Sequence, residues 1–421
     1  MAGDPAGYET AADARKVTGE ASSADAPEIR PGSYTDAISA GEKLYYGVSL
    51  DGRSGAFLSA VVAPKAGTPL DHRDGVEVSL RKTDGDECAG GKVRFGSGRT
   101  ARPIAASADR VIEEGGDCQK AGRYFLVVER VGDSAAGARS WPVEIRYMSE
   151  PGLRGGASAK GDGRRMVPPT GRRSAPPVPP TGKGTVRRGG TGFNDAPAVG
   201  GGVWRDAARP GETRFYRVPL EWGQRLSATV ELANAVPRGG RSGYASGGLG
   251  AELYNTARGR VVSGSTGYDG QGAVLSLGPT APVAYENRFG VADDEAAAMR
   301  FAGWYYLAIT FGAEAAELTD EPVRLTLRLT VDGEAESGPP YAGAAAAAGF
   351  GVSERDREAA ERGWTAEESG GGGESGAEGL SGTRRLVAVA GIGSGTALLL
   401  GLGAWRLVAR RRYEVRGRAS R

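Results

Sequence analysis

Short runs of β-branched, aromatic and other apolar residues, bounded by Gly, Asp and Pro, fill two regions of the chain. The first region holds such runs at residues 44–50, 56–63, 76–80, 124–130 and 143–147, and the second at residues 215–220, 226–232, 273–277, 304–311 and 323–331. Runs of this length and composition predict β-strands, and neither region has the 3.6-residue apolar period of an amphipathic helix. Several short strands without intervening helices predict an antiparallel sandwich or barrel in each region.

The two regions are copies of one unit. The segment that begins Gly32-Ser33-Tyr34-Thr35-Asp36 and runs to Leu50 recurs without a gap from Gly202 to Leu220, 170 positions later. Near the far end, Ala121-Gly122-Arg123-Tyr124 recurs as Ala302-Gly303-Trp304-Tyr305, and Pro142-Val143 recurs as Pro322-Val323. An internal repeat of this length predicts two domains of the same fold.

The motifs of the repeat resemble those of a known family. Each copy has a Gly-x-Tyr/Trp-x-Asp sequence, a Gly-Glu turn at Gly41-Glu42 or Gly211-Glu212, an aromatic-Tyr-x-Val-x-Leu strand and a late Ala-Gly-x-Tyr strand, and the second copy opens with Asn194-Asp195-Ala196-Pro197. This order resembles the bacterial pre-peptidase C-terminal domain over residues 28–150 and 192–333. The resemblance implies a jelly-roll-like β-sandwich of the kind found beside secreted peptidases. That family commonly carries Asp-x-Asp before the aromatic strand, so the Gly-Glu turns count against its calcium site here.

We expect an all-β protein of two antiparallel jelly-roll-like β-sandwich domains joined by a disordered linker, plus one C-terminal transmembrane helix. The expected parts are a disordered N-terminal segment at 1–27, the first sandwich at 28–150, a Pro/Gly/Arg-rich linker at 151–191, the second sandwich at 192–333, an Ala/Glu/Gly-rich juxtamembrane stalk at 334–385, the membrane span at 386–409 and a basic cytoplasmic tail at 410–421. The linker has too few apolar residues to bury a core. Within the stalk, Ser353-Glu354-Arg355-Asp356 predicts a capping box that starts one short polar helix through Arg362.

The membrane span is predicted by an uncharged apolar run of 20 residues, 386–405, which is long enough to cross a bilayer as a helix. Arg410, Arg411 and Arg412 follow it, whereas an acidic, glycine-rich stretch lies before it. By the positive-inside rule the tail is cytoplasmic, and the N-terminal bulk lies outside the plasma membrane in a single-pass type I arrangement. Gly391 and Gly395 form a small-xxx-small pair, which allows two such helices to pack as a homodimer. A tail-anchored protein with cytoplasmic domains is the alternative, and it would place the C-terminal arginines outside.

Export requires a signal, and residues 1–25 contain no basic segment followed by an apolar stretch. We therefore expect that the natural chain begins upstream of Met1 with a signal peptide.

The cysteines agree with an exported location. Cys88 and Cys118 both lie in turn-like segments of the first sandwich, and an even pair in an exported domain most simply forms a disulfide.

Few residues suggest chemistry. The one histidine, His72, lies in a polar loop, and no Gly-x-Ser-x-Gly elbow accompanies it, so we expect no catalytic triad. Asp293, Asp294 and Glu295 are the candidate ligands for calcium, because carboxylate oxygens suit that ion, and a solvated acidic turn is the alternative.

Several aromatic residues lie on the predicted strands, where they either pack in the core or line a ligand groove. They are Tyr45, Tyr46, Phe215, Tyr216, Trp304, Tyr305 and Tyr306. A net charge of +2 provides no global field for nucleic acid.

We therefore expect a membrane-anchored, extracytoplasmic binding or scaffold protein that is not an enzyme. Its expected partners are the membrane and another exported protein or a cell-wall polymer, with no nucleic acid and no cofactor beyond the candidate calcium. The alternative is an accessory or localisation subunit for a secreted peptidase or for an adhesion-type, von Willebrand A-like partner. The whole arrangement, together with the excess of arginine over lysine, resembles membrane-anchored secreted proteins of high-G+C bacteria that carry no assigned activity.

Overall fold

The computed structural model describes residues 7–68, 70–96, 100–113, 115–132, 140–155, 178–235, 243–289 and 293–368. The expected membrane span at 386–409 and the basic tail at 410–421 lie outside these residues, as do most of the linker and the end of the stalk. No helix within the described ranges is both long and apolar enough to cross a membrane.

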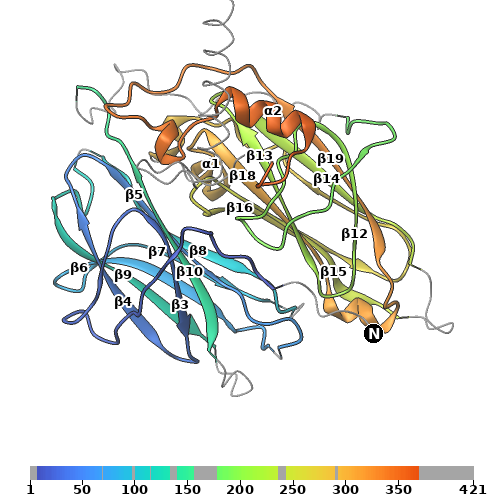
Figure 1. The fold of residues 1–421 in the computed structure, drawn as a ribbon, viewed down its shortest axis with the longest axis horizontal. Helices are drawn as coiled ribbons and strands as arrows, with labels where there is room; N and C mark the ends of the chain where they lie inside the picture. The colour runs from blue at the N-terminus through green and yellow to red at the C-terminus, as the bar shows by residue number, and fades with distance from the viewer. Residues whose placement is uncertain are drawn as a thin grey trace, which may run out of the picture. The chain divides into compact units, whose positions relative to one another are not determined.

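The first sandwich consists of two five-stranded sheets (Figure 1). One sheet has the order β1 (Arg15–Lys16), β3 (Gly32–Ile38), β10 (Trp141–Glu150), β5 (Gly55–Val62) and β8 (Ile104–Arg110), and the other has the order β2 (Glu28–Ile29), β4 (Lys43–Leu50), β9 (Gly122–Val131), β6 (Gly75–Lys82) and β7 (Glu87–Arg94). The two-residue strands β1 and β2 pair in parallel with β3 and β4, and the other pairs are antiparallel. Alternate residues of the strands point inward and form one apolar core between the sheets.

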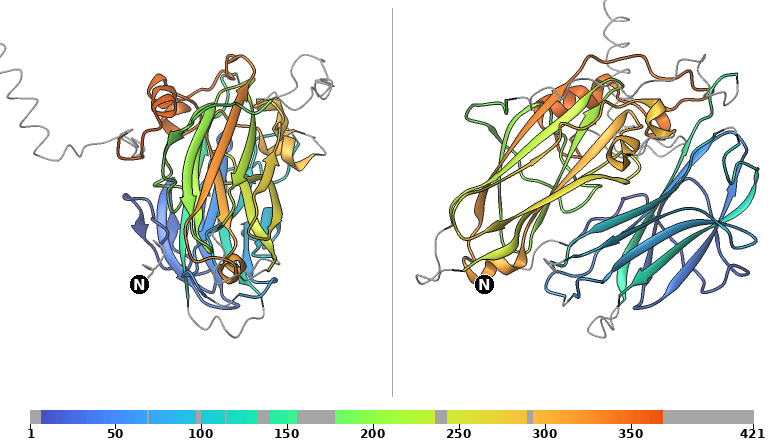
Figure 2. Two further views of the ribbon diagram at one scale, coloured as in Figure 1. Left: turned by 90° about the vertical axis from the view of Figure 1, so that its right-hand side faces the viewer. Right: turned by 180° about the vertical axis from the view of Figure 1, so that it is seen from behind.

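The second sandwich has a five-stranded and a four-stranded sheet, and Figure 2 shows it from two further sides. One sheet has the order β11 (Thr185–Val186), β12 (Gly202–Ala208), β19 (Val323–Asp332), β14 (Arg225–Leu232) and β17 (Ala273–Leu277), and the other has the order β13 (Thr213–Leu220), β18 (Gly303–Phe311), β15 (Ala245–Tyr254) and β16 (Arg260–Tyr268). The short helices are α1 (Asp294–Ala298) and α2 (Glu354–Arg362). The predicted antiparallel β-sandwich fold is confirmed in both copies.

An aspartate that recurs in the two copies joins the edge of each sandwich to its core. In the first copy Asp36 Oδ2 accepts hydrogen bonds from the Tyr46 hydroxyl at 2.7 Å and from the backbone N–H of Gly19 at 2.7 Å. The second copy repeats both bonds at 2.8 Å with Asp206, Tyr216 and Gly189. Both tyrosines are buried, and burial raises their pKa above the ordinary value. The Asp and the second aromatic residue of the repeated motifs therefore form one buried polar contact that holds the segment before the first long strand.

That earlier segment belongs to the fold. Residues 7–27, for which the composition predicts no structure, contain strand β1, one turn and a β-bridge from Glu20 to Tyr45. The repeat itself extends into this segment, because Asp25-Ala26-Pro27 recurs as Asp195-Ala196-Pro197 at the same 170-residue spacing. Strands of two residues are too short to produce a periodic apolar pattern, and only the spacing of the repeat indicates them.

The Gly-Glu turns have a structural role in both copies. Gly41 and Gly211 have φ values of +70° and +84°, a left-handed conformation that glycine adopts without strain. The carboxylate of the next residue then accepts a backbone N–H of the same turn, from Ser39 to Glu42 at 2.7 Å and from Arg209 to Glu212 at 2.9 Å. These carboxylates stabilise the turn that leads into the aromatic strand.

Helix α2 begins at the predicted capping box and packs against the second sandwich. The Ser353 hydroxyl oxygen accepts from the Asp356 N–H, and Asp356 accepts from the Ser353 N–H. Two alanines of the helix, Ala359 and Ala360, are buried together with Ala198, whose N–H donates to the Trp364 carbonyl at 2.7 Å. The described part of the expected stalk, up to residue 368, therefore packs against the sandwiches, through helix α2 on the second and through Tyr341 and Phe350 on the first.

Substitution of the repeated aspartate should destabilise each sandwich. Asp36→Ala and Asp206→Ala each leave a buried tyrosine hydroxyl and a backbone N–H without their acceptor, and each unpaired group costs about 1–3 kcal/mol. We expect each substitution to lower the free energy of unfolding by at least about 2 kcal/mol in urea titrations, and Tyr46→Phe to cost less. Asp84→Ala, at a side chain that is 62% exposed, is the control, and a loss at Asp36 no larger than at Asp84 would contradict the role assigned to the contact.

Candidate functional site

Two apolar clusters join the sandwiches through the outer face of the β3–β10–β5–β8 sheet. Every residue of β5 is buried, because Leu58, Ala60 and Val62 face the core while Phe57 and Val61 face the second sandwich. One cluster contains Val61, Ala105, Phe193, Ala196, Phe215, Tyr254 and Ala308. The other contains Phe57, Met148, Ala257, Phe301, Ala345 and Phe350. The described residues of both sandwiches accordingly fall within one compact unit.

Ion pairs cross the same interface. Arg258 Nη1 lies 3.0 Å from Glu144 Oε2, and Arg288 Nη1 lies 2.5 Å from Glu150 Oε2, with all four side chains at most 6% exposed. Two further pairs, Arg300 with Asp109 and Arg102 with Glu252, are less buried. The first sandwich supplies three of the four carboxylates, all from outward positions of β8 and β10. Polar side chains buried in an apolar interface require partners, so these pairs fix how the two copies fit together.

Glu144 receives hydrogen bonds from two separate parts of the chain and an ion pair from a third. The Tyr8 hydroxyl donates to it from the N-terminal segment, and the side-chain amide of Asn194 donates at 3.0 Å. Arg258 completes the set and lies 4.8 Å from the centre of the Phe193 ring. Burial alone would raise the pKa of Glu144, but Arg258 and the hydrogen bonds outweigh burial and hold this pKa below its ordinary value. Glu144 is therefore ionised at neutral pH and fully paired.

Glu150 has a similar environment at the end of β10. Arg288 binds it through both guanidinium Nη atoms, at 2.5 and 3.1 Å, and the Tyr341 hydroxyl donates at 2.6 Å. The Arg288 guanidinium also stacks on Tyr285, 3.7 Å from the ring centre. Residues that follow the second sandwich thus help to satisfy a carboxylate of the first.

A polar pocket of about 220 Å³ opens at the end of the first sandwich. Its lining residues are Pro31, Ser49, Leu50, Asp51, Ser54, Gly55, Ala56, Arg110, Tyr147 and Ser149. Arg110 ends β8 and Tyr147 lies on β10, and both occupy inward positions where the apolar core ends. The loop between β4 and β5 supplies Asp51 and Ser54. The pocket is a candidate for a small-molecule site.

Arg110 is held by backbone oxygens instead of by a carboxylate. Its Nη2 donates to the carbonyl oxygens of Asp51 and Ser54, both at 2.6 Å, and its Nε and Nη1 make no hydrogen bond. The Asp51 carboxylate lies 4.0 Å from Nη2. Burial lowers the pKa of Arg110, while Tyr124, Asp51 and Tyr147 favour its charged form.

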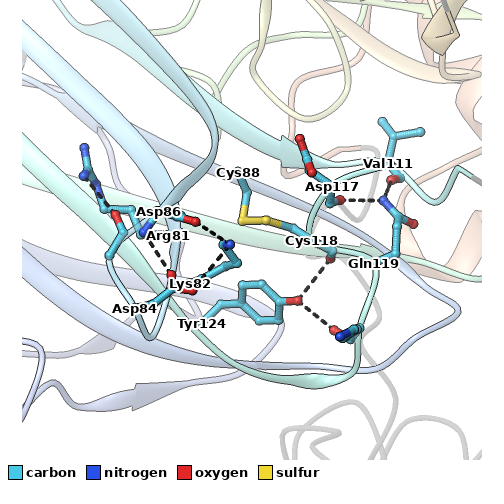
Figure 3. The surroundings of a disulfide bond; sticks show 12 residues. Arg81, Lys82, Asp84, Asp86, Cys88, Val111, Asp117, Cys118, Gln119 and Tyr124 are labelled. Atoms are coloured by element: carbon cyan, nitrogen blue, oxygen red, sulfur yellow. Dashed lines mark hydrogen bonds and ion pairs between the residues drawn. A yellow bond between two sulfur atoms is a disulfide. The ribbon is translucent and has the colours of Figure 1, made fainter. Parts of the chain in front are cut away.

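The predicted disulfide is confirmed (Figure 3). Cys88 of β7 bonds to Cys118 of the loop before β9, with the two Cα atoms 5.8 Å apart. The Tyr124 hydroxyl donates to the carbonyl of Cys118 at 3.1 Å and to that of Lys120 at 2.7 Å. The tyrosine and the disulfide together fix this loop against the sandwich.

The candidate calcium ligands Asp293, Asp294 and Glu295 lie at the start of helix α1. Asp293 caps α1 by accepting the Glu295 N–H at 3.0 Å, and the described residues contain no group of three or more His, Cys, Asp or Glu that could hold a metal ion. His72 is 62% exposed beside Asp71. The arginines Arg410, Arg411 and Arg412 and the glycines Gly391 and Gly395 lie outside the described residues.

The strand aromatics pack instead of lining a groove. The inward-facing Tyr46, Tyr216 and Tyr305 belong to the cores of the two sandwiches. The outward-facing Phe215, Tyr306, Trp304 and Tyr45 pack in smaller clusters, the first two at the interface between the sandwiches. Sequence reasoning missed the interface and the Arg110 pocket, because a charged residue in a strand normally indicates a solvent-facing position.

Removal of one member of a buried interface pair should be costly. Arg288→Met leaves Glu150 buried beside Tyr341 without its cation, and such a loss typically costs about 3–5 kcal/mol. We expect a matching fall in thermal and urea stability, and we expect Arg288→Met combined with Glu150→Gln to cost less than the sum of the two single changes. Lys92→Met, in the exposed pair with Glu77, should change stability by no more than about 1 kcal/mol. Equal effects at Arg288 and Lys92 would show that the interface pair is not buried in solution.

The disulfide should contribute to stability and should be present in cells. The residues are 30 positions apart, and closure of such a loop stabilises by about 3–4 kcal/mol in the chain-entropy model. Cys88→Ser combined with Cys118→Ser should therefore lower the unfolding free energy by roughly that amount. Alkylation of protein taken from cells without reductant should modify no cysteine, and two modified cysteines per chain would contradict an oxidised pair in its natural compartment.

Comparison with known proteins yields fold-level similarities only. No protein-family model matches the chain, and no curated protein matches it. Among solved structures, the tandem CBM22-1–CBM22-2 domains of Xyn10C from Paenibacillus barcinonensis are 13% identical, with 72% of this chain and 92% of that chain covered and a TM-score of 0.21. The M60 catalytic domain with the CBM51-1 and CBM51-2 domains of ZmpB from Clostridium perfringens is 10% identical, with 69% and 34% covered and a TM-score of 0.17. The assignment of the β-sandwich fold rests on the strand pairing itself and not on these similarities.

Proposed function

We propose that this chain is a non-catalytic, membrane-anchored extracytoplasmic binding or scaffold protein. Its two sandwiches, at residues 28–150 and 192–333, form one head, and the span at 386–409 holds that head outside the plasma membrane. The observation that carries the proposal is the buried interface between the sandwiches. Domains joined only by a linker move relative to one another unless their contact is large and apolar. A head with two apolar clusters and buried ion pairs presents its outer surfaces in a fixed arrangement, which is what a scaffold requires.

The buried interface also argues against the alternative that the two sandwiches act as independent binding modules. The interface covers one sheet of each copy, so the two copies do not offer the same surfaces to a partner. Tyr8, from the N-terminal segment, and Tyr341, after the second sandwich, both bind carboxylates of this interface. The head therefore depends on segments that flank the sandwiches, and it is a single unit of binding.

The relation to the pre-peptidase C-terminal domain belongs to the proposal too. It is supported by the role of the shared motif residues, because the recurring Asp, the Gly-Glu turn and the aromatic strand make matching contacts in the two copies. If the chain is related to that family, it would serve as an accessory to a secreted peptidase. Extracytoplasmic placement is supported by the disulfide, since such bonds persist in oxidising compartments.

Topology is the direct test of the proposal. In wall-stripped cells, a protease that cannot cross the membrane should digest the head, while a tag placed after Arg421 should remain protected until the cells are lysed. Deletion of residues 386–421 should release the head into the medium. A cytoplasmic protein that stays intact serves as the control for lysis. A protected head together with an accessible tag would contradict the proposal.

A further inference from the structure

We propose that the pocket beside Arg110 and Tyr147 binds a small molecule through a carboxylate group, with the rest of the ligand no larger than about one sugar ring. The proposal goes beyond the scaffold function and does not depend on the membrane anchor. It rests on three features: the unmet hydrogen-bonding capacity of a buried arginine, the weak neutralisation of its charge, and the absence of a charged residue at the same place in the second sandwich, where Thr280 lies.

The first feature is the state of the buried arginine. Tyr147 is 5% exposed and Arg110 is 3% exposed, and both line the pocket. Within the described residues, Nε and Nη1 of Arg110 are buried and make no hydrogen bond. Buried polar groups are nearly always paired, so an incompletely paired guanidinium beside a cavity indicates a group in that cavity that compensates it.

The second feature is the charge of Arg110. The nearest carboxylate, Asp51, is 62% exposed and lies 4.0 Å from Nη2. Its oxygens accept instead from the Arg53 N–H at 2.8 Å, from the Ser54 N–H at 2.6 Å and from the Ser54 hydroxyl at 2.9 Å. Asp51 thus organises its own loop and neutralises the guanidinium only in part. An anion in the pocket would compensate the buried cation directly.

The third feature is the comparison with the other copy of the repeat. Gly32 pairs with Tyr147, and Gly202, 170 positions later, pairs with Leu329. Ala56 pairs with Arg110, whereas Leu226, 170 positions after Ala56, exchanges hydrogen bonds with Thr280. Leu and Thr in the second sandwich therefore replace Tyr and Arg in the first. The fold does not require a buried arginine at this place, which indicates that Arg110 serves binding.

The chemistry of the lining selects the ligand. A guanidinium is a planar fork of N–H donors that matches the two oxygens of a carboxylate, and the Tyr147 hydroxyl adds a donor beside it. The serine hydroxyls of positions 49, 54 and 149 suit a hydroxyl-bearing body. At about 220 Å³ the pocket is smaller than the roughly 300–1,000 Å³ of sites for drug-sized ligands. A sugar acid such as a uronate has the required size and groups.

Calorimetric titration of the full chain in detergent with glucuronate, acetate and glucose tests the proposal. We expect glucuronate to bind and glucose to bind at least tenfold more weakly, since loss of a charged hydrogen bond of about 1.5–3 kcal/mol corresponds to about tenfold or more. If acetate binds as strongly as glucuronate, the carboxylate alone is recognised. If acetate binds more weakly, the sugar ring also contributes to binding. Both outcomes support the site. Equal binding of glucose and glucuronate, or no heat from any of the three, would overturn it.

Variants locate the binding. Arg110→Met should weaken glucuronate binding at least tenfold, and Tyr147→Phe, which changes only one oxygen, should weaken it about threefold to tenfold through loss of a neutral hydrogen bond. Tyr147→Phe and Ser149→Ala keep the test valid if Arg110→Met does not fold. Arg328→Met, at a partly buried arginine that pairs with Glu231 in the second sandwich, is the matched control and should bind like the natural chain. Unchanged binding in folded Tyr147→Phe and Ser149→Ala would overturn the assignment of the pocket.

Discussion

Two carboxylates on the outer face of one strand determine how the halves of this protein fit together. Glu144 and Glu150 of β10 are buried beneath the second sandwich, where Arg258 and Arg288 meet them. Ion pairs of this kind contribute little net free energy relative to apolar contacts, but a docking that left one unpaired would cost several kcal/mol. The apolar clusters around Phe57 and Phe193 thus supply stability, whereas the ion pairs specify one arrangement and exclude others.

The two buried carboxylates also hold the segments that flank the sandwiches in place. Each carboxylate has room for a further donor, and these donors come from Tyr8 and Tyr341, which are more than 300 positions apart in the chain. Helix α2 follows Tyr341 and buries its alanines against the second sandwich. The interface therefore accounts for the order of residues whose composition predicts none, and it provides the fixed head on which the proposed scaffold role depends.

The sequence predicts the strands, the repeat and the disulfide because each leaves a local or periodic signal. The continuous apolar run of β5 predicts a strand, but its composition does not reveal that a second domain covers the outer face. Glu144 and Glu150 lie among apolar residues along β10 as they would in a solvent-exposed strand, so their burial depends on tertiary contacts alone. Arg110 likewise suggests a strand end that is exposed to water. In the second sandwich the uncharged Thr280 bonds to Leu226, the counterpart of the residue that pairs with Arg110.

The central claim, that the two sandwiches form one rigid head, is tested most directly by a distance measurement between them. Nitroxide labels at Arg94→Cys of β7 and Val274→Cys of β17, both exposed positions of the two sandwiches, permit electron–electron resonance on the intact chain. The account predicts a single narrow distance distribution that broadens when Arg258 and Arg288 are both changed to Met. A broad distribution in the unchanged chain would contradict it.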